Sequence, residues 1–108
     1  MEAATVFRAL GDPVRLQMVQ RLTGNRSCTI GALSGGLGIT RQGARKHLQV
    51  LADAELVVLE PKGRDVLVHL DPRTLELAMR FIADLERKWE ARLDALREFV
   101  EEPPPIEG

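Results

Sequence analysis

The stretch TIGALSGGLGITRQGARKHLQVLADAELV, residues 29–57, decides the fold, because its pattern predicts two short helices joined by a tight turn. Thr29 is expected to cap the first helix, and Thr40 to cap a second helix that runs to about Ala54. The apolar residues of the second helix form one stripe: Ala44, Leu48 and Leu51. Two helices joined at residues 37–39, the second opened by a polar cap, are typical of a helix-turn-helix.

The other face of the second helix has the side chains that reading DNA requires. Arginine pairs with guanine edges and glutamine with adenine edges, and both also bind phosphates. Gly43 costs this helix about 1 kcal/mol relative to alanine, so it indicates either a close approach or a tolerated surface glycine. We expect DNA to be bound by Thr40, Arg41, Gln42, Arg45 and Lys46.

Charge is distributed unevenly along the chain, although the net charge is only −1. Residues 13–52 contain six basic residues and no acidic one, whereas residues 71–108 contain ten acidic and six basic residues. This pattern favours a molecule with one positively charged face that can bind a polyanion. The alternative is an ordinary solvated face that happens to lack acidic residues.

A β-rich segment, residues 57–70, follows the second helix and reverses at Gly63, which predicts a hairpin. Lys62 and Arg64 flank the turn. They are expected to contact phosphates or an adjacent minor groove, although basic hairpin tips are often ordinary solvated loops. The predicted fold class is therefore mainly α with a small β-hairpin wing (α+β), a winged helix-turn-helix.

Further helices are expected at both ends of the chain. Residues 3–10 form the first, Asp12 and Pro13 open the next, and Asp71 with Pro72 opens a long last helix. The apolar stripe of the last helix has no second layer to cover it, so another copy of the chain is its expected partner. The residues expected between two copies are Val6, Phe7, Leu75, Met79, Ile82, Leu85, Trp89, Leu93 and Leu96.

We expect one domain, 1–102, with dimerisation helices at both ends, and a disordered tail at 103–108. No apolar run is long enough to span a membrane and no secretion signal is recognised, so a cytoplasmic protein without a membrane partner is expected. Cys28 is the only cysteine, which excludes an internal disulfide.

The chain resembles the ArsR-type family of winged-helix repressors over roughly residues 3–100. Three segments carry the resemblance: FRALGDPVRLQMVQRL (7–22), the quoted stretch 29–57, and KGRDVLVHLDP (62–72) before a long helix. The resemblance implies a homodimer that binds a palindromic operator in double-stranded DNA and leaves it when a signal arrives. It also implies the DNA-binding role for the residues of the second helix named above.

The chain departs from the metal-sensing members of that family. Thr29 and Gly31 stand where those members carry a cysteine pair, and the last helix contains no histidine. We therefore expect no metal and no cofactor, and the inducer stays unidentified. Glu55 stands where the family usually has glycine, so a left-handed backbone there would strain it by about 1 kcal/mol.

The two histidines do not indicate an enzyme. His47 lies beside the apolar stripe and is expected to bond within the domain, and His69 is expected to face solvent. Neither has a nucleophile or carboxylate partner in its motif, so no catalytic set is recognised. The alternative to a DNA-binding regulator is a winged-helix module that docks on a partner protein.

Overall fold

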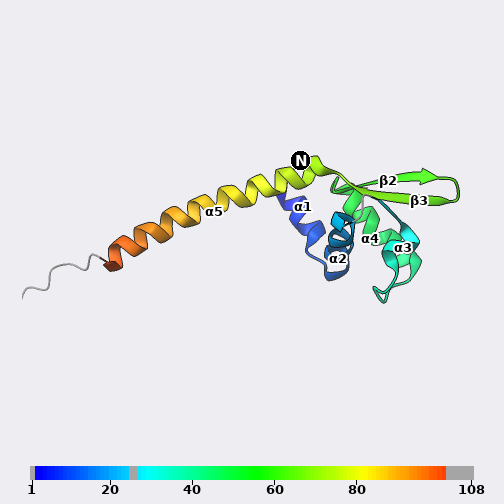
Figure 1. The fold of residues 1–108 in the computed structure, drawn as a ribbon, viewed down its shortest axis with the longest axis horizontal. Helices are drawn as coiled ribbons and strands as arrows, with labels where there is room; N and C mark the ends of the chain where they lie inside the picture. The colour runs from blue at the N-terminus through cyan, green and yellow to red at the C-terminus, as the bar shows by residue number, and fades with distance from the viewer. Residues whose placement is uncertain (1, 25–26, 102–108) are drawn as a thin grey trace, which may run out of the picture. The chain divides into compact units, whose positions relative to one another are not determined.

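The computed structural model describes residues 2–24 and 27–101, and it confirms a mainly helical winged helix-turn-helix fold (Figure 1). The chain divides into two compact units, Met1–Ala78 and Met79–Gly108, which are described separately. The expected tail at 103–108 lies outside the described residues. In chain order the elements are α1 (Ala3–Leu10), α2 (Pro13–Gly24), β1 (Cys28–Thr29), α3 (Ile30–Ser34), α4 (Arg41–Asp53), β2 (Val57–Lys62), β3 (Asp65–Leu70) and α5 (Pro72–Glu101).

Four helices begin at the side-chain caps that the sequence predicts. In each case a carboxylate or hydroxyl oxygen accepts a hydrogen bond from a backbone N–H of the first turn, which would otherwise lack a partner. The capping residues and their donors are Asp12 with Val14 (2.9 Å), Thr29 with Ala32 (3.1 Å), Thr40 with Gly43 (2.9 Å) and Asp71 with Arg73 (3.0 Å).

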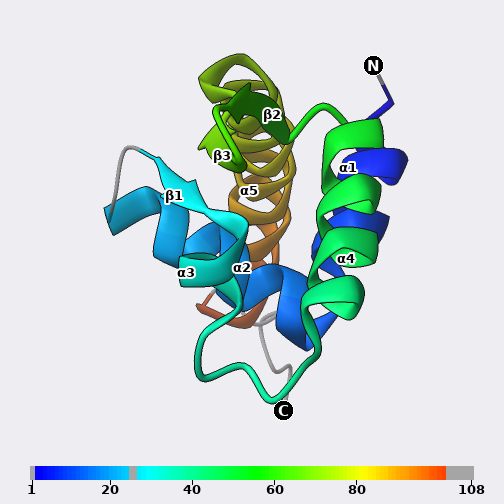
Figure 2. The ribbon, with the colours of Figure 1, turned by 90° about the vertical axis from the view of Figure 1, so that its right-hand side faces the viewer.

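The sheet has three antiparallel strands in the order β1-β3-β2, one more than the sequence predicts. β2 and β3 form the predicted hairpin, with Gly63 at φ 62° in its turn. The additional strand β1 pairs Cys28 with Val68 and Thr29 with Leu67 (Figure 2). A two-residue strand has no periodicity of its own, and its partner lies far along the chain, so local pattern does not reveal it.

The core of the first unit joins all four of its short helices to the wing. Fully buried side chains come from each of these elements: Val6, Met18, Leu33, Leu48, Leu51, Leu56 and Val68. Val6 packs among residues of its own chain and is fully buried there, and its predicted place between two copies stays a prediction. Phe7 and Leu75 are partly buried against the same core.

The second unit exposes an apolar face on α5 from Met79 onward. The most exposed of its large apolar side chains are Met79, Trp89, Leu96, Phe99 and Val100, at 58–74%. Ile82, Leu85 and Leu93 are 40–51% exposed. Phe81 and Phe99 widen this face beyond the predicted stripe.

Candidate nucleic-acid interface

The turn between α3 and α4 fixes where the exposed helix begins. Gly36 and Gly38 both adopt left-handed backbone angles, with φ of 75° and 69°. Residues with a Cβ rarely adopt this region, so both positions favour glycine. Thr40 then closes the turn by accepting the N–H of Gly43, and α4 starts at a defined residue and angle.

Gly43 has a reason within the chain for being glycine. A Cβ at this position would lie 3.2 Å from the capping hydroxyl oxygen of Thr40, a tight contact that would push against the cap. Of the two explanations left open by the sequence, close approach therefore has support, and the group approached is the helix cap itself.

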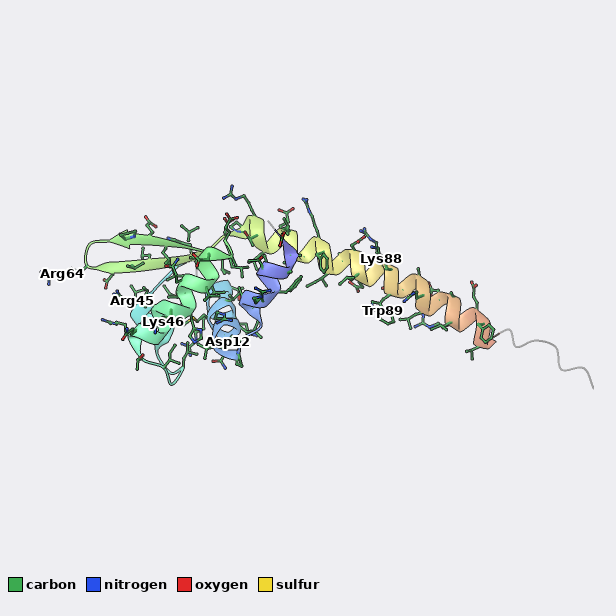
Figure 3. All side chains as sticks on the ribbon, turned by 180° about the vertical axis from the view of Figure 1, so that it is seen from behind. Asp12, Arg45, Lys46, Arg64, Lys88 and Trp89 are labelled. Carbon is green, nitrogen blue, oxygen red and sulfur yellow. The ribbon has the colours of Figure 1, made fainter. Side chains whose placement is uncertain are left out.

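One face of α4 is buried in the core and the opposite face is exposed to solvent. Ala44, Leu48 and Leu51 are completely buried. The side chains of the other face are exposed: Arg41, Gln42, Arg45 and Lys46. Figure 3 shows Arg45 and Lys46 on α4 and Arg64 at the tip of the hairpin. The helix therefore presents cations and an amide on a rigidly held scaffold.

The arginines of the acid-free segment divide into two groups. Arg15 donates to the carbonyl of Ala9 (2.6 Å), and Arg21 donates to the carbonyl of Leu33 (3.0 Å). These two guanidinium groups hold the fold together, a role that the charge count alone does not reveal. By contrast, the three cations of α4 have no hydrogen-bond or ion-pair partner among residues 2–24 and 27–101, and they are exposed: Arg41, Arg45 and Lys46.

His47 bonds within the domain, as the sequence predicts. Its Nδ1 lies 3.2 Å from Nη1 of Arg15 and 3.8 Å from Oδ2 of Asp12. The backbone N–H of Arg15 donates a hydrogen bond to the Asp12 carboxylate and lowers the pKa of Asp12 below its ordinary value. The nearby charges of His47 and Arg15 lower that pKa further. This cluster ties α4 to the start of α2.

The wing presents Lys62 and Arg64 on either side of Gly63, and both side chains are exposed. Two carboxylates, Glu60 and Asp65, also lie on these strands. Glu60 is bonded to His69 across the strands, with 2.7 Å between Oε2 and Nε2. The Glu60 carboxylate therefore already has a hydrogen-bond partner. His69 is only partly exposed, whereas the sequence predicts that it faces solvent.

Glu55 adopts a left-handed backbone, with φ 59°, so the condition under which this position would be strained is met. It is the only non-glycine residue with positive φ among residues 2–24 and 27–101. The residue ends the α4 segment and directs the chain into β2. The side chain of Glu55 is exposed, so replacing it removes no buried contact.

Replacing Glu55 with glycine should therefore stabilise the protein. The left-handed conformation costs a non-glycine residue roughly 1–2 kcal/mol, and the greater freedom of glycine in the unfolded chain offsets part of that. We expect the free energy of unfolding to rise by about 0.5–1 kcal/mol, measured by chemical denaturation.

The control is Gln17→Gly, at an exposed position inside α2, which should lower the free energy of unfolding by about 1 kcal/mol. A destabilised Glu55→Gly protein would contradict the strain argument.

Thr29 and Gly31, which stand where metal-sensing members of the family carry cysteines, have structural roles in this chain. Thr29 caps α3, and a Cβ on Gly31 would meet Nη2 of Arg41 at 3.0 Å. Within the part of the chain that the structure describes, no three His, Cys, Asp or Glu side chains are grouped closely enough to hold a metal ion. In the same residues, no helix is both long and apolar enough to cross a membrane.

Comparison with known proteins places the fold among transcriptional regulators. A family model for helix-turn-helix domains matches residues 10–60. The chain is 38% identical over 65 residues to the HTH-type transcriptional regulator YuzN of Bacillus subtilis, covering 55% of this chain and 71% of that protein.

Solved structures extend the similarity beyond the matched segment. An ArsR-like transcriptional regulator from Rhodococcus sp. RHA1 superposes with a TM-score of 0.72 at 28% identity, covering 90% of this chain and 91% of that one. A possible transcriptional regulator for arsenical resistance superposes with a TM-score of 0.68 at 27% identity, covering 93% and 97%.

Proposed function

The chain belongs to the ArsR-type helix-turn-helix transcriptional regulators and is a DNA-binding protein, and from this premise we propose that it is a homodimeric repressor of a palindromic operator. In this proposal, α4 enters the major groove of the DNA and the wing lies along the DNA phosphate backbone. The repressor acts in the cytoplasm and leaves its operator when a signal arrives. No metal, cofactor or catalytic step takes part.

The exposed face of α4 is the observation that carries the proposal. Its cations have no partner within the described residues, while the opposite face of the same helix is fully buried. Unpaired guanidinium and amide groups on a fixed helix can form bidentate bonds with base edges. Thr40, whose hydroxyl is engaged in the cap, supports binding by holding the helix start in place.

Selection of bound sequences from a random duplex pool tests the proposal. The enriched sites should be inverted repeats whose half-sites lie one helical turn apart, about 34–36 Å, because a two-fold symmetric dimer presents two identical helices. Affinity should fall steeply with salt, with a slope of about −0.9 for each phosphate neutralised. A pool that yields no enriched sequence would contradict the proposal.

Arg64→Ala should weaken binding to the operator and to a scrambled duplex to the same extent. A side chain at the wing tip contributes charge to the backbone, so its loss should make the salt slope shallower by about one unit. The measurement is a titration of both duplexes at several salt concentrations.

Arg97→Ala is the matched control, because it removes an equal charge from an arginine of α5 that pairs with Asp94 at 3.3 Å. If Arg64→Ala instead changed the preferred sequence, the wing would be reading bases.

A further inference from the structure

A hollow of about 610 Å³ lies within the first unit, where the end of α4, the start of β2 and the start of α5 meet. All the residues that line it belong to segments 52–58 and 71–77. Sites for small organic ligands occupy about 300–1,000 Å³. The lining residues are distinct from those expected to bind DNA and from those expected between two copies. The hollow is therefore open to a separate use.

Thr74 lines this hollow with a buried polar group that has no partner. The residue is only 5% exposed. Its hydroxyl has no hydrogen bond among residues 2–24 and 27–101, yet it is not sealed from solvent. A buried hydroxyl without a hydrogen bond costs free energy. A ligand that donates a hydrogen bond to this hydroxyl would remove that cost.

Glu55 supplies a carboxylate to the same hollow. Its φ of 59° is a conformation that glycine adopts at lower cost. Residues in strained conformations cluster at ligand and active sites, where the side chain has a task. The Glu55 carboxylate has no hydrogen bond or ion pair within the described residues, so it is available to a bound cation.

The other charges of the hollow cancel. Arg73 is bound by Asp71, with 3.2 Å between Nη2 and Oδ2, and it interacts with Glu55 only at longer range. On its other side, Glu55 borders a smaller hollow that also includes Glu2 and Asp53. The unbalanced charge around Glu55 is therefore negative, which favours a cationic ligand over an anionic one.

The remaining wall of the hollow is apolar. Ala52 of α4, Val57 and Val58 of β2 and Leu77 of α5 form it. Val58 and Leu77 are 49% and 38% exposed, so they present apolar surface that a ligand can cover. Removing such surface from water favours a ligand with an apolar body.

We propose that this hollow binds a small organic ammonium ion with an apolar body. The ammonium group pairs with the Glu55 carboxylate and donates a hydrogen bond to the Thr74 hydroxyl, while the apolar body covers Val58 and Leu77. The inference goes beyond the proposed function and does not depend on it, because none of these residues is assigned to DNA binding or to dimerisation.

Three probes that share a phenyl ring test the sign of the charge. Benzylamine is cationic at neutral pH, benzyl alcohol is neutral and benzoate is anionic. Each is titrated into isotope-labelled full-length protein, and the backbone amide resonances are followed. Benzylamine should bind with a dissociation constant of about 1 mM or lower, with the shifts centred on Glu55, Val58 and Thr74. Benzyl alcohol should bind about 3- to 10-fold more weakly, because it lacks the charge.

Two results of these titrations would overturn the proposal. Benzoate that binds as tightly as benzylamine would show that the hollow does not select a cation. Benzylamine that produces no localised shifts at about ten times the expected dissociation constant would show that the hollow is not a site.

Glu55→Gln isolates the carboxylate, because it keeps the shape of the side chain and removes its charge. The variant should lose the 3- to 10-fold or so preference for benzylamine and bind benzyl alcohol unchanged. Glu86→Gln is the matched control, because it removes an equal charge from an exposed position of α5 outside the hollow. A Glu55→Gln protein that kept the preference would contradict the pairing with Glu55.

Thr74→Val isolates the hydroxyl, because valine fills nearly the same volume. The variant should bind both benzylamine and benzyl alcohol roughly 2- to 10-fold more weakly, since one hydrogen bond is lost from each complex. Its free energy of unfolding should not fall, because the hydroxyl has no partner within the described residues. Wild-type affinity of Thr74→Val for both probes would overturn the role of the hydroxyl.

Discussion

Replacing both Leu85 and Trp89 with aspartate should convert the protein to a monomer and weaken operator binding by at least about 100-fold. Both side chains are exposed on α5, at 43% and 59%, and lie on the same face. Two carboxylates there prevent burial against a second copy. A dimer gains its second half-site through effective concentration, which adds roughly 10²–10⁴ in affinity, so a monomer loses that factor.

Sedimentation velocity and operator titration measure the two effects. The first unit has its own core and should stay folded in the variant, so thermal unfolding still shows a cooperative transition. Ala83→Asp combined with Arg87→Gln is the control, because it makes the charge of α5 more negative by the same amount at two residues outside the apolar stripe. A folded dimer of the Leu85 and Trp89 variant would show that the copies meet elsewhere.

Arg45→Ala should weaken binding to the operator about 5- to 150-fold while affecting scrambled DNA much less. A bidentate contact with a base contributes about 1–3 kcal/mol of discrimination, which corresponds to that range. Arg45 is exposed on α4 one turn beyond Gln42, so the two side chains can meet neighbouring bases. Titration of both duplexes at the same salt concentration measures the difference.

Gln49→Ala supplies the control within the same helix. Its amide donates to Asp53 at 2.8 Å, so this side chain is already engaged one turn further along α4. We expect its loss to change operator affinity little. An Arg45→Ala protein that lost affinity equally for both duplexes would assign Arg45 to the phosphate backbone rather than to a base.

The sequence predicts those elements that are determined by neighbouring residues, namely the capped helix starts and the turn of the hairpin. Thr40 and Asp71 are polar caps before apolar runs, and both begin helices where expected. Gly63 stands in the turn of the hairpin. The resemblance raised the question of a left-handed backbone at Glu55, and only the structure answers it.

Features that depend on distant parts of the chain were not predicted. β1 exists because Cys28 and Thr29 meet β3, some forty residues later in the chain. Val6 shares the pattern of an amphipathic helix with Phe7, but only the packed core decides which of them is fully buried. Arg15 is one of the six basic residues of the acid-free segment, and the charge count alone does not show that its guanidinium binds a backbone carbonyl.

The guanidinium of Arg15 connects α1 with α4, the helix whose exposed face carries the unpaired cations. Its Nε holds the carbonyl of Ala9 at 2.6 Å, and its Nη1 lies 3.2 Å from the ring of His47 on α4. The group is planar and rigid, so a displacement of α1 by about 1 Å either breaks one of these bonds or carries α4 with it. Movement of α1 is therefore coupled, through this one side chain, to the orientation of α4.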